Sequence, residues 1–522
     1  MLQDHEPIFG KNVIETLSEG MYDNPLFLFR EYVQNSADAI DAAESTGILK
    51  KGYGQIVITI DTESRNISFE DNGTGIPVKL VNKMLANIGD SQKDRKSNKG
   101  FRGIGRLGGL GYCQKVRFET SAFGENYKST LEWDAKTLHD ILADKDEHMH
   151  AGQLIKQITT TSTREYPEKE HFFKVTLVNV NKNSDELLDT EEVRKYLSMV
   201  APVPFDYAKF QYVDDIERFL QEEGISKPNE YQLYLNGDEI RKGYETPLKI
   251  EGKKDVDILG VVCRPIKYDD KVLGWYWFCV SRFEGVLPKN CWQRCIRLRK
   301  SNIQIGEADC LSNHPKRGLP LWREDRGNNY FIGEIHTLDV DLIPNSRRDY
   351  FNQDEACRNF EAALTLEFKN LHDLYHSASV LRSQNKVLQD AHEAKKDFEN
   401  KEKSGAFYSP EDRTEAQNKV KELESKIPAA QKAIEKTLKK SNSGALKLVA
   451  DEYTEELVNS YDTIPTKPFK PDLTPTKGYA KDNIDIEVKK VLDVVFEVLD
   501  KMLPPDKADP IHNAIIKRFI KK

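Results

Sequence analysis

Residues 26–43 carry apolar side chains at intervals of three and four, which is the pattern of an amphipathic helix. Its apolar side is formed by Phe29, Val33, Ala37 and Ile40. Glu31, Asn35 and Asp38 are spaced at i, i+4 and i+7, so they share a second, polar face. Two interpretations of this polar stripe are open: an ordinary solvated helix face, or an acid–amide–acid set that faces a ligand.

The region around this helix alternates between helical and strand patterns. Residues 55–73 read as two strands joined by a polar turn, and further strands are predicted within 116–133 and 172–180. Helices on one face of a mixed sheet would account for this pattern. We therefore predict that residues 1–190 form an α/β domain of the two-layer sandwich type.

The following pattern predicts a second α/β domain over residues 191–355. It begins with a helical stretch that ends in prolines at 202 and 204. Residues 231–244 contain Asn-Gly between two strand-like runs, which is a hairpin signal. Residues 270–283 and 295–306 supply further strands.

Charged helical patterns dominate the rest of the chain. Residues 356–445 contain two heptad-like seams separated by a loop, and Pro428 lies inside the second seam, where it should kink or split the helix. Either an antiparallel helical hairpin or an intermolecular coiled coil fits this pattern. Residues 446–522 comprise a Pro-rich linker and two amphipathic helices. These helices either form a dimer contact or pack onto their own chain.

Composition narrows the partners. The 522 residues include 38% hydrophobic and 31% charged residues, and 77 Lys+Arg against 85 Asp+Glu give a net charge of −8. A nucleic-acid partner is therefore possible but not indicated by charge. No apolar run reaches the ~20 residues of a membrane span, and the first residues lack a signal-peptide pattern. The seven cysteines are scattered, so we expect a cytoplasmic protein without disulfides.

Two glycine-punctuated stretches follow the helix: FEDNGTGIP at 69–77 and NKGFRGIGRLGGLGYC at 98–113. With the helix, they resemble in order the N box and the two glycine boxes of the GHKL ATPases, which include gyrase, the ninety-kilodalton heat-shock chaperones, histidine kinases and MutL. The likeness is greatest to the heat-shock chaperones. It is strong over residues 10–125, thinner to about 350, and absent beyond. The second glycine box departs from the chaperone form by its extra glycines and by Arg106 in place of an aromatic residue.

This resemblance implies an ATPase that uses ATP and Mg²⁺. Glu31 would be the general base that polarises the attacking water, and Asn35 would bind Mg²⁺ through its side-chain oxygen. Asp71 would accept a hydrogen bond from the adenine amino group. Asp38 would either reach the nucleotide through water or be a helix-surface acid. Without the glycine boxes, Glu31 could equally pair with Arg30.

The glycine boxes would contribute backbone and positive charge. Gly73 and Gly75 would let the backbone pass close to the base. The resemblance also gives nucleotide contacts to Asn87 and to the loop residues Lys99, Gly100, Phe101, Arg102, Gly103, Ile104 and Gly105. In the loop, backbone N–H groups would surround the phosphates. The charged run at 89–99 is expected to form a mobile lid over them.

A second implied contribution comes from the middle of the chain. In the heat-shock chaperones an arginine of the middle domain reaches the γ-phosphate. The best match here is LIPNSRRDYF at 342–351, in which Arg347 aligns with that arginine and Arg348 is the runner-up. A guanidinium suits this task because it is always charged and grips phosphate oxygens by two bonds.

Three functions compete at this stage. The favoured one is an ATP-driven, chaperone-like clamp, homodimeric and acting on a protein client or partner. The alternative is a DNA-linked GHKL ATPase of the MutL or MORC type, in a setting such as a bacterial defence system. A histidine kinase is disfavoured because about 330 residues follow the ATPase region, whereas kinases usually place their phosphoacceptor helices before it.

Overall fold

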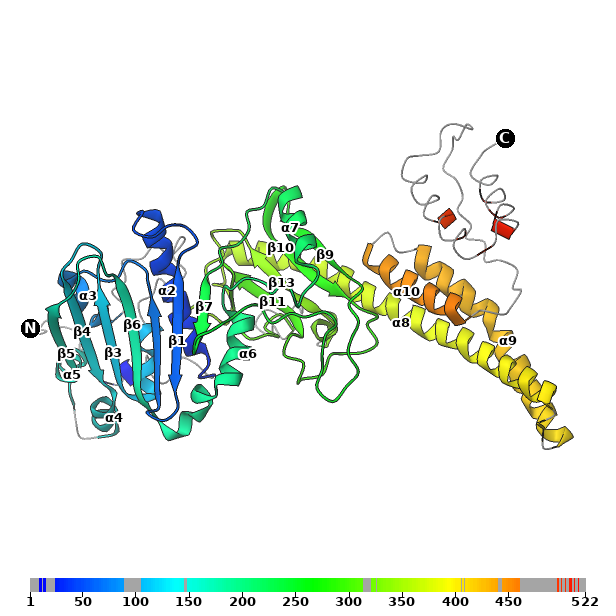
Figure 1. Cartoon of the computed structure of the whole chain (residues 1–522), viewed down its shortest axis with the longest axis horizontal. Helices are drawn as coiled ribbons and strands as arrows, with labels where there is room; N and C mark the ends of the chain where they lie inside the picture. The colour runs from blue at the N-terminus through cyan, green and yellow to red at the C-terminus, as the bar shows by residue number, and fades with distance from the viewer. Residues whose placement is uncertain are drawn as a thin grey trace, which may run out of the picture. The chain divides into compact units, whose positions relative to one another are not determined.

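A computed structural model describes residues 9–11, 13–15, 24–88, 105–144, 148–312, 321–324, 326–404, 406–407, 409–439 and 444–460, with scattered positions after 494. The chain divides into two compact units, Met1–Leu457 and Val458–Lys522. The account below concerns the first unit (Figure 1). The Pro-rich linker and most of the terminal helices expected from the sequence lie outside the described residues.

The first sheet has eight described strands in the order β5-β4-β3-β6-β2-β1-β7-β8. Neighbouring strands are antiparallel except β1 and β7, which are parallel. The strands are β1 (Gln55–Asp61), β2 (Asn66–Asp71), β3 (Cys113–Ser121), β4 (Tyr127–Asp134), β5 (Thr159–Glu165), β6 (Phe172–Val180), β7 (Gln232–Leu235) and β8 (Asp238–Glu239).

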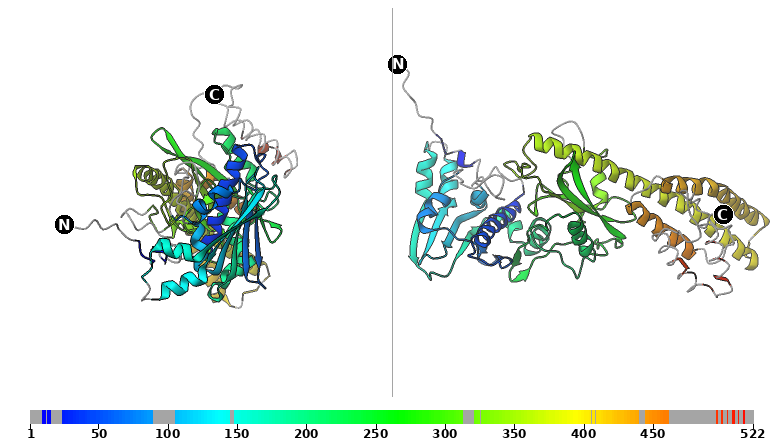
Figure 2. Two further views of the ribbon diagram at one scale, coloured as in Figure 1. Left: turned by 90° about the vertical axis from the view of Figure 1, so that its left-hand side faces the viewer. Right: turned by 90° about the horizontal axis from the view of Figure 1, so that it is seen from above.

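One face of this sheet is covered by helices. Side chains of β1 alternate strictly between exposed and buried, because only one face meets the core. Its buried residues Ile56, Ile58 and Ile60 share one apolar core with helical residues such as Phe29, Leu138 and Leu154. Figure 2 shows the helices that lie against this face of the sheet. The helical segments are α2 (Phe27–Ser45), η1 (Val78–Leu80), α3 (Val81–Leu85), η2 (Gly105–Gly111), α4 (Ala135–Ala143), α5 (Ala151–Ile158) and η3 (Lys182–Leu188). The α/β fold predicted for this region is confirmed.

The first sheet does not end at residue 190, where the sequence suggested a domain boundary. After α6 (Thr190–Val200) and α7 (Val213–Glu222), the chain returns and adds β7 alongside β1. The predicted hairpin is present, with Asn236 and Gly237 at positive φ (50° and 90°), as a two-residue hairpin turn of this kind requires. The pattern located the hairpin correctly, but pairing with a strand so distant in sequence leaves no local signal.

The second sheet has the order β12-β11-β13-β10-β9. Strand β10, which lies between β13 and β9, is buried on both faces. Tyr276 and Phe278 join the core shared with α8, whereas Trp275 and Trp277 join the core shared with α7. The elements are β9 (Gly260–Tyr268), β10 (Lys271–Val280), β11 (Cys295–Lys300), β12 (Ile303–Gln304), η5 (Gly327–Tyr330) and β13 (Ile332–Thr337).

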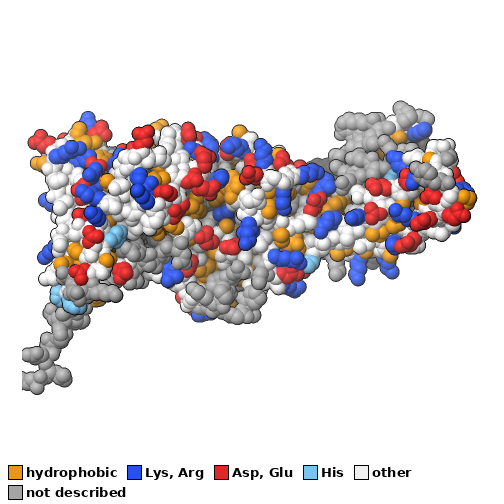
Figure 3. Space-filling model, turned by 90° about the horizontal axis from the view of Figure 1, so that it is seen from below, with side chains coloured by type: hydrophobic (Ala, Val, Ile, Leu, Met, Phe, Trp, Pro, Cys, Tyr) orange, Lys and Arg blue, Asp and Glu red, His pale blue; other side chains and the backbone are white. Residues whose placement is uncertain are grey.

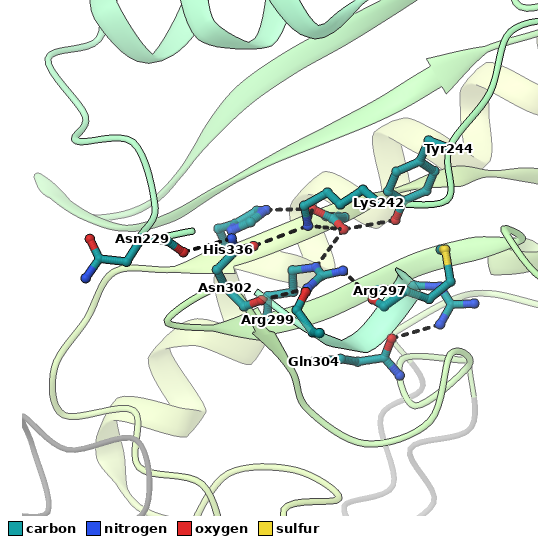
Figure 4. A network of polar contacts seen from close by, with 11 residues as sticks. Asn229, Lys242, Tyr244, Arg297, Arg299, Asn302, Gln304 and His336 are labelled. Atoms are coloured by element: carbon teal, nitrogen blue, oxygen red, sulfur yellow. Dashed lines mark hydrogen bonds and ion pairs between the residues drawn. The ribbon is translucent and has the colours of Figure 1, made fainter. Parts of the chain in front are cut away.

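A buried polar network lies on the β11–β13 part of this sheet (Figure 4). Glu334 on β13 lies 2.9 Å from Lys242 Nζ, 2.6 Å from Arg299 Nε and 2.9 Å from His336 Nε2, and it accepts a hydrogen bond from the Tyr244 hydroxyl at 3.0 Å. One carboxylate therefore faces two cations. Burial, together with the nearby Arg299 guanidinium, lowers the pKa of Lys242 to about 8.

The same network joins the second sheet to the last turn of α6 and to the stretch after β8. Arg299 donates hydrogen bonds to the backbone carbonyls of Met199 and Asn302. Lys242 belongs to the stretch just after β8, and its Nζ also donates to the Asn302 side chain at 3.2 Å. Both sheets are thus tied to a common set of buried charges.

The helices after residue 354 are long. α8 spans Glu355–Ser404, α9 spans Pro410–Lys439 and α10 spans Gly444–Ser460. α8 and α9 run antiparallel, because Lys395 pairs with Glu424 while Arg413 pairs with Glu402. The expected split at Pro428 does not occur, since α9 continues through that residue.

Candidate active site

The helix α2 carries the polar stripe into the interior. Gly47, at φ +74°, follows its last turn, a conformation that favours glycine. The predicted apolar residues are buried in the core. Glu31 and Asp38 are each only 5% exposed and Asn35 is half-buried, so the stripe is not a solvated face. Burial of Asp38 likewise removes the interpretation of that residue as a surface acid.

The first glycine stretch packs against α2, and Thr74 N donates to the Ala39 carbonyl at 3.3 Å. Asp71 ends β2, is buried, and its Oδ1 accepts a hydrogen bond from Gly73 N at 3.0 Å. A Cβ on Gly73 would lie 2.6 Å from Ala39 Cβ, and a Cβ on Gly75 (φ +62°) would lie 1.9 Å from the Ser121 carbonyl oxygen. No larger side chain fits at either position without moving the backbone.

The second glycine stretch meets the other end of the same helix face. A Cβ on Gly105 would lie 2.6 Å from Glu31 Oε2. The two stretches therefore touch α2 at Ala39 and at Glu31, eight residues and about 12 Å apart along the axis. Asn35 and Asp38 fall between these contacts, so the stripe is bracketed by both glycine segments.

Glu31 lies between two arginines. Its Oε1 is 3.7 Å from Arg30 Nη2 and 3.9 Å from Arg348 Nε, and Oε1 accepts no hydrogen bond from the described residues. The Arg30 guanidinium is also buried and stacks over the Phe27 ring at 4.2 Å. The pairing of Glu31 with Arg30, which the sequence left open, is thus present as a long contact alongside the second one.

Arg348 reaches Glu31 from the turn at 344–351. Pro344 and Phe351 bridge the base of this turn, and Gly306 N donates to the Arg348 carbonyl at 2.7 Å. Arg348 itself adopts φ +53°, an uncommon conformation for a residue with a side chain. Arg348 is buried and Arg347 is exposed. The alignment favoured Arg347, whereas the structure brings Arg348 to Glu31.

Several expected nucleotide contacts fall outside the described residues. These are Lys99, Gly100, Phe101, Arg102, Gly103 and Ile104, together with the expected lid at 89–99. Asn87 is described and exposed, and its carbonyl accepts a hydrogen bond from the Arg106 guanidinium. Burial lowers the pKa of Arg106 to about 10. The Arg106 guanidinium therefore ties the second glycine box to the segment that follows α3.

Three supporting residues gave no sequence signal. Thr120 on β3 accepts a hydrogen bond from Ile76 N at 2.8 Å and donates to the Phe172 carbonyl at 3.0 Å. His171 Nδ1 lies 2.7 Å from the Gly73 carbonyl oxygen. The Tyr32 hydroxyl donates to the Arg106 carbonyl at 3.0 Å. Each fixes a glycine segment, yet each stands in an ordinary strand or helix pattern.

Comparison with known proteins agrees with this geometry. Residues 27–165 match the family model described as histidine kinase-, DNA gyrase B-, and HSP90-like ATPase. This region is a GHKL ATPase domain, close to that of the ninety-kilodalton heat-shock chaperones. The match takes in α2 and the first glycine stretch, so it covers the residues that form the bracketed stripe.

Similar curated proteins are bacterial chaperones named HtpG. The chain is 26% identical to that of Wigglesworthia glossinidia brevipalpis over 183 residues, 31% of this chain and 27% of the relative. It is 27% identical to that of Shewanella sediminis (strain HAW-EB3) over 153 residues, which are 26% of this chain and 24% of the relative. It is 28% identical to that of Ruthia magnifica subsp. Calyptogena magnifica over 140 residues, which are 23% of this chain and 23% of the relative. The chain thus spans about a quarter of the length of these relatives.

Surface properties bear on possible partners. On the face drawn in Figure 3, acidic and basic side chains are interspersed without a large patch of one sign. None of the described helices combines the length and apolarity needed to cross a membrane.

Proposed function

We propose that this protein binds ATP with Mg²⁺ in the bracketed site on α2, hydrolyses it, and uses the cycle to open and close a homodimeric clamp on a protein client. The observation that carries the proposal is that the two glycine stretches contact one face of α2 about 12 Å apart, at Ala39 and Glu31. Adenine would lie at the Asp71 end and the phosphates at the Glu31 end.

Glu31 is the proposed general base. A carboxylate can take a proton from water at neutral pH. Burial of this side chain excludes bulk solvent, and its Oε1 has no hydrogen bond from the described residues. The carboxylate is therefore available to orient a single water molecule.

Asn35 is the proposed ligand for Mg²⁺, and Asp71 is the proposed residue that selects adenine. The half-buried Asn35 amide oxygen, one helical turn from Glu31, is a hard ligand that fits Mg²⁺, and bound Mg²⁺ would neutralise phosphate charge. Asp71 has a buried carboxylate held by Gly73 N. It would accept a hydrogen bond from the adenine amino group and reject guanine, which carries a carbonyl there.

Arg348, rather than Arg347, is the proposed arginine that contacts the γ-phosphate. Its guanidinium is buried 3.9 Å from Glu31, so it lies beside the proposed position of the attacked phosphate. Arg347 is exposed on the same turn. Because Arg348 comes from a segment after the second sheet, hydrolysis would depend on how that sheet sits against the ATPase domain.

Paired variants test this assignment. Glu31→Ala should bind a non-hydrolysable ATP analogue but hydrolyse ATP at least ~10²-fold more slowly. Arg348→Ala should keep analogue affinity within a few-fold and lower turnover by ~10-fold or more. Arg347→Ala, one residue away and exposed, is the matched control and should behave as the wild type. If Glu31→Ala loses binding and turnover equally, Glu31 has a structural role and is not the general base. If Arg348→Ala keeps wild-type turnover, Arg348 does not contact the γ-phosphate.

The clamp is tested separately. Light scattering after size exclusion, with and without the analogue, should show a dimer whose elution volume increases when it closes. A monomer in both states would reject the clamp and leave the ATPase assignment intact. If nucleic acid is the partner instead, DNA binding should be measurable and should weaken steeply with salt.

A further inference from the structure

Two histidines and a glutamate converge away from the ATPase site. Among the described residues, Glu324, His372 and His376 each offer a candidate ligand atom, and these atoms lie within 4.8 Å of one another. The histidines are four residues apart on α8, so they project from the same helix face. Glu324 comes from the short segment 321–324 that precedes η5. The cluster therefore joins two elements that are distant in sequence.

The spacing approaches that of a metal site. Ligands about 2.0–2.2 Å from a tetrahedral ion lie roughly 3.3–3.6 Å from one another. His376 Nε2 already lies 3.4 Å from Glu324 Oε1. The rings of His372 and His376 have centroids 4.3 Å apart, and the His376 side chain is 48% exposed. Because the His376 side chain is half exposed, it has room to rotate toward a bound ion.

Neighbouring groups leave the right atoms available. The Tyr375 hydroxyl lies 2.8 Å from His372 Nδ1, an outer contact that leaves Nε2 for an ion. Arg326 Nε donates to Glu324 Oε2 at 2.8 Å, which leaves Oε1 facing His376. Both contacts resemble the outer hydrogen bonds that orient metal ligands in proteins.

The segment that carries Glu324 is fixed without any ion. Trp322 is buried and stacks on Phe368 of α8, with ring centroids 4.5 Å apart. Arg323 Nη1 lies 4.0 Å from Asp373 on the same helix. The carboxylate is therefore held near the histidines by packing, and an ion would not have to order the segment.

We propose that Glu324, His372 and His376 bind one divalent transition-metal ion, best fitted by Zn²⁺, with solvent completing the coordination. Two imidazoles and one carboxylate suit Zn²⁺, whereas Mg²⁺ and Ca²⁺ prefer oxygen ligands alone. The ion crosslinks segment 321–324 to α8. It therefore stabilises the attachment of the second sheet to the long helix, independently of ATP.

Metal titration of the full chain tests the site. After chelator treatment, calorimetry should find one tight Zn²⁺ per chain, and Co²⁺ should give the visible absorption of a four-coordinate site. Glu324→Gln and His376→Ala should each weaken Zn²⁺ binding at least ~10-fold and abolish the Co²⁺ spectrum. Both residues are partly exposed, so the variants should fold. Zn²⁺ should raise the unfolding temperature of the wild type but not that of these two variants.

Control variants separate this site from adventitious histidine binding. His392→Ala alters the same helix outside the cluster, and the His148→Ala/His150→Ala double variant removes a histidine pair near the first sheet. Both should bind Zn²⁺ like the wild type. Equal affinity in every variant, or loss only in the double variant, would overturn the proposal. No tight binding by the wild type would reduce the cluster to an ion pair between His376 and Glu324.

Discussion

Protonation of His336 should destabilise the protein as the pH falls below neutrality. The imidazole is buried, stacked on Trp275 with ring centroids 4.4 Å apart, and its Nε2 lies 2.9 Å from Glu334. Burial lowers its pKa from 6.5 to about 4, with Lys242 and Arg299 acting in the same direction against the carboxylate. The folded protein therefore keeps this histidine neutral over a range where the unfolded chain protonates it.

The sign and size follow from linkage. Between pH 6.5 and pH 4 the unfolded state binds one more proton, so the free energy of unfolding falls as the pH falls. A shift from 6.5 to about 4 corresponds to about 3 kcal/mol in total, of which about 2 kcal/mol is lost between pH 7 and pH 5. The pKa of Glu334 is held well below 4.5 by the two cations, so its own loss comes at lower pH.

Urea denaturation at pH 7 and at pH 5 measures this loss. His336→Gln is the matched variant, because its amide can still donate to Glu334 but does not titrate. The wild type should lose about 2 kcal/mol more than His336→Gln over this interval. Equal losses in the two proteins would show that His336 titrates near its ordinary pKa and would refute the reasoning.

Three further outcomes are expected. Asp71→Asn should remain folded but show no ATP binding by calorimetry. Near-normal ATP affinity in this variant would refute the assignment of Asp71 to the adenine amino group. Gly75→Ala should lower the free energy of unfolding by more than the ~1–3 kcal/mol of positive-φ strain, because the added Cβ meets the Ser121 carbonyl. Gly124→Ala is the control: Gly124 also has a positive φ but lies in open space, so this variant should lose only the strain term when both are measured by urea denaturation. Glu334→Gln should lower the free energy of unfolding by ~3–5 kcal/mol, because two buried cations lose their carboxylate partner. A melting temperature within about 2 °C of that of the wild type would contradict this expectation.

Local patterns predicted the parts of this protein that depend on near neighbours. The polar stripe of α2 follows from helical spacing, and the turn at Asn236 and Gly237 follows from the freedom of these residues to adopt positive φ. The order of the two glycine stretches was also readable. Their contacts with Ala39 and Glu31 give that order a physical meaning.

Features that depend on distant segments were not readable. The first sheet extends beyond residue 190 because β7 pairs with β1 across the chain, and no local pattern reports such a pairing. The choice between Arg347 and Arg348 depends on a turn in which Arg348 takes φ +53°, and two adjacent arginines carry no signal for that geometry. Glu334 stands in a strand pattern, and only the fold brings Lys242 and Arg299 to it.

The parallel pairing of β1 with β7 has a consequence for protein synthesis. Gln55 and its partner Gln232 are 177 residues apart. At roughly 5–20 residues per second, the ribosome takes about 10–35 s to supply the missing strand. Throughout that time the edge of β1 is an open template for pairing with other nascent chains. Translation speed across residues 62–231 should therefore influence how much of this protein reaches its native state.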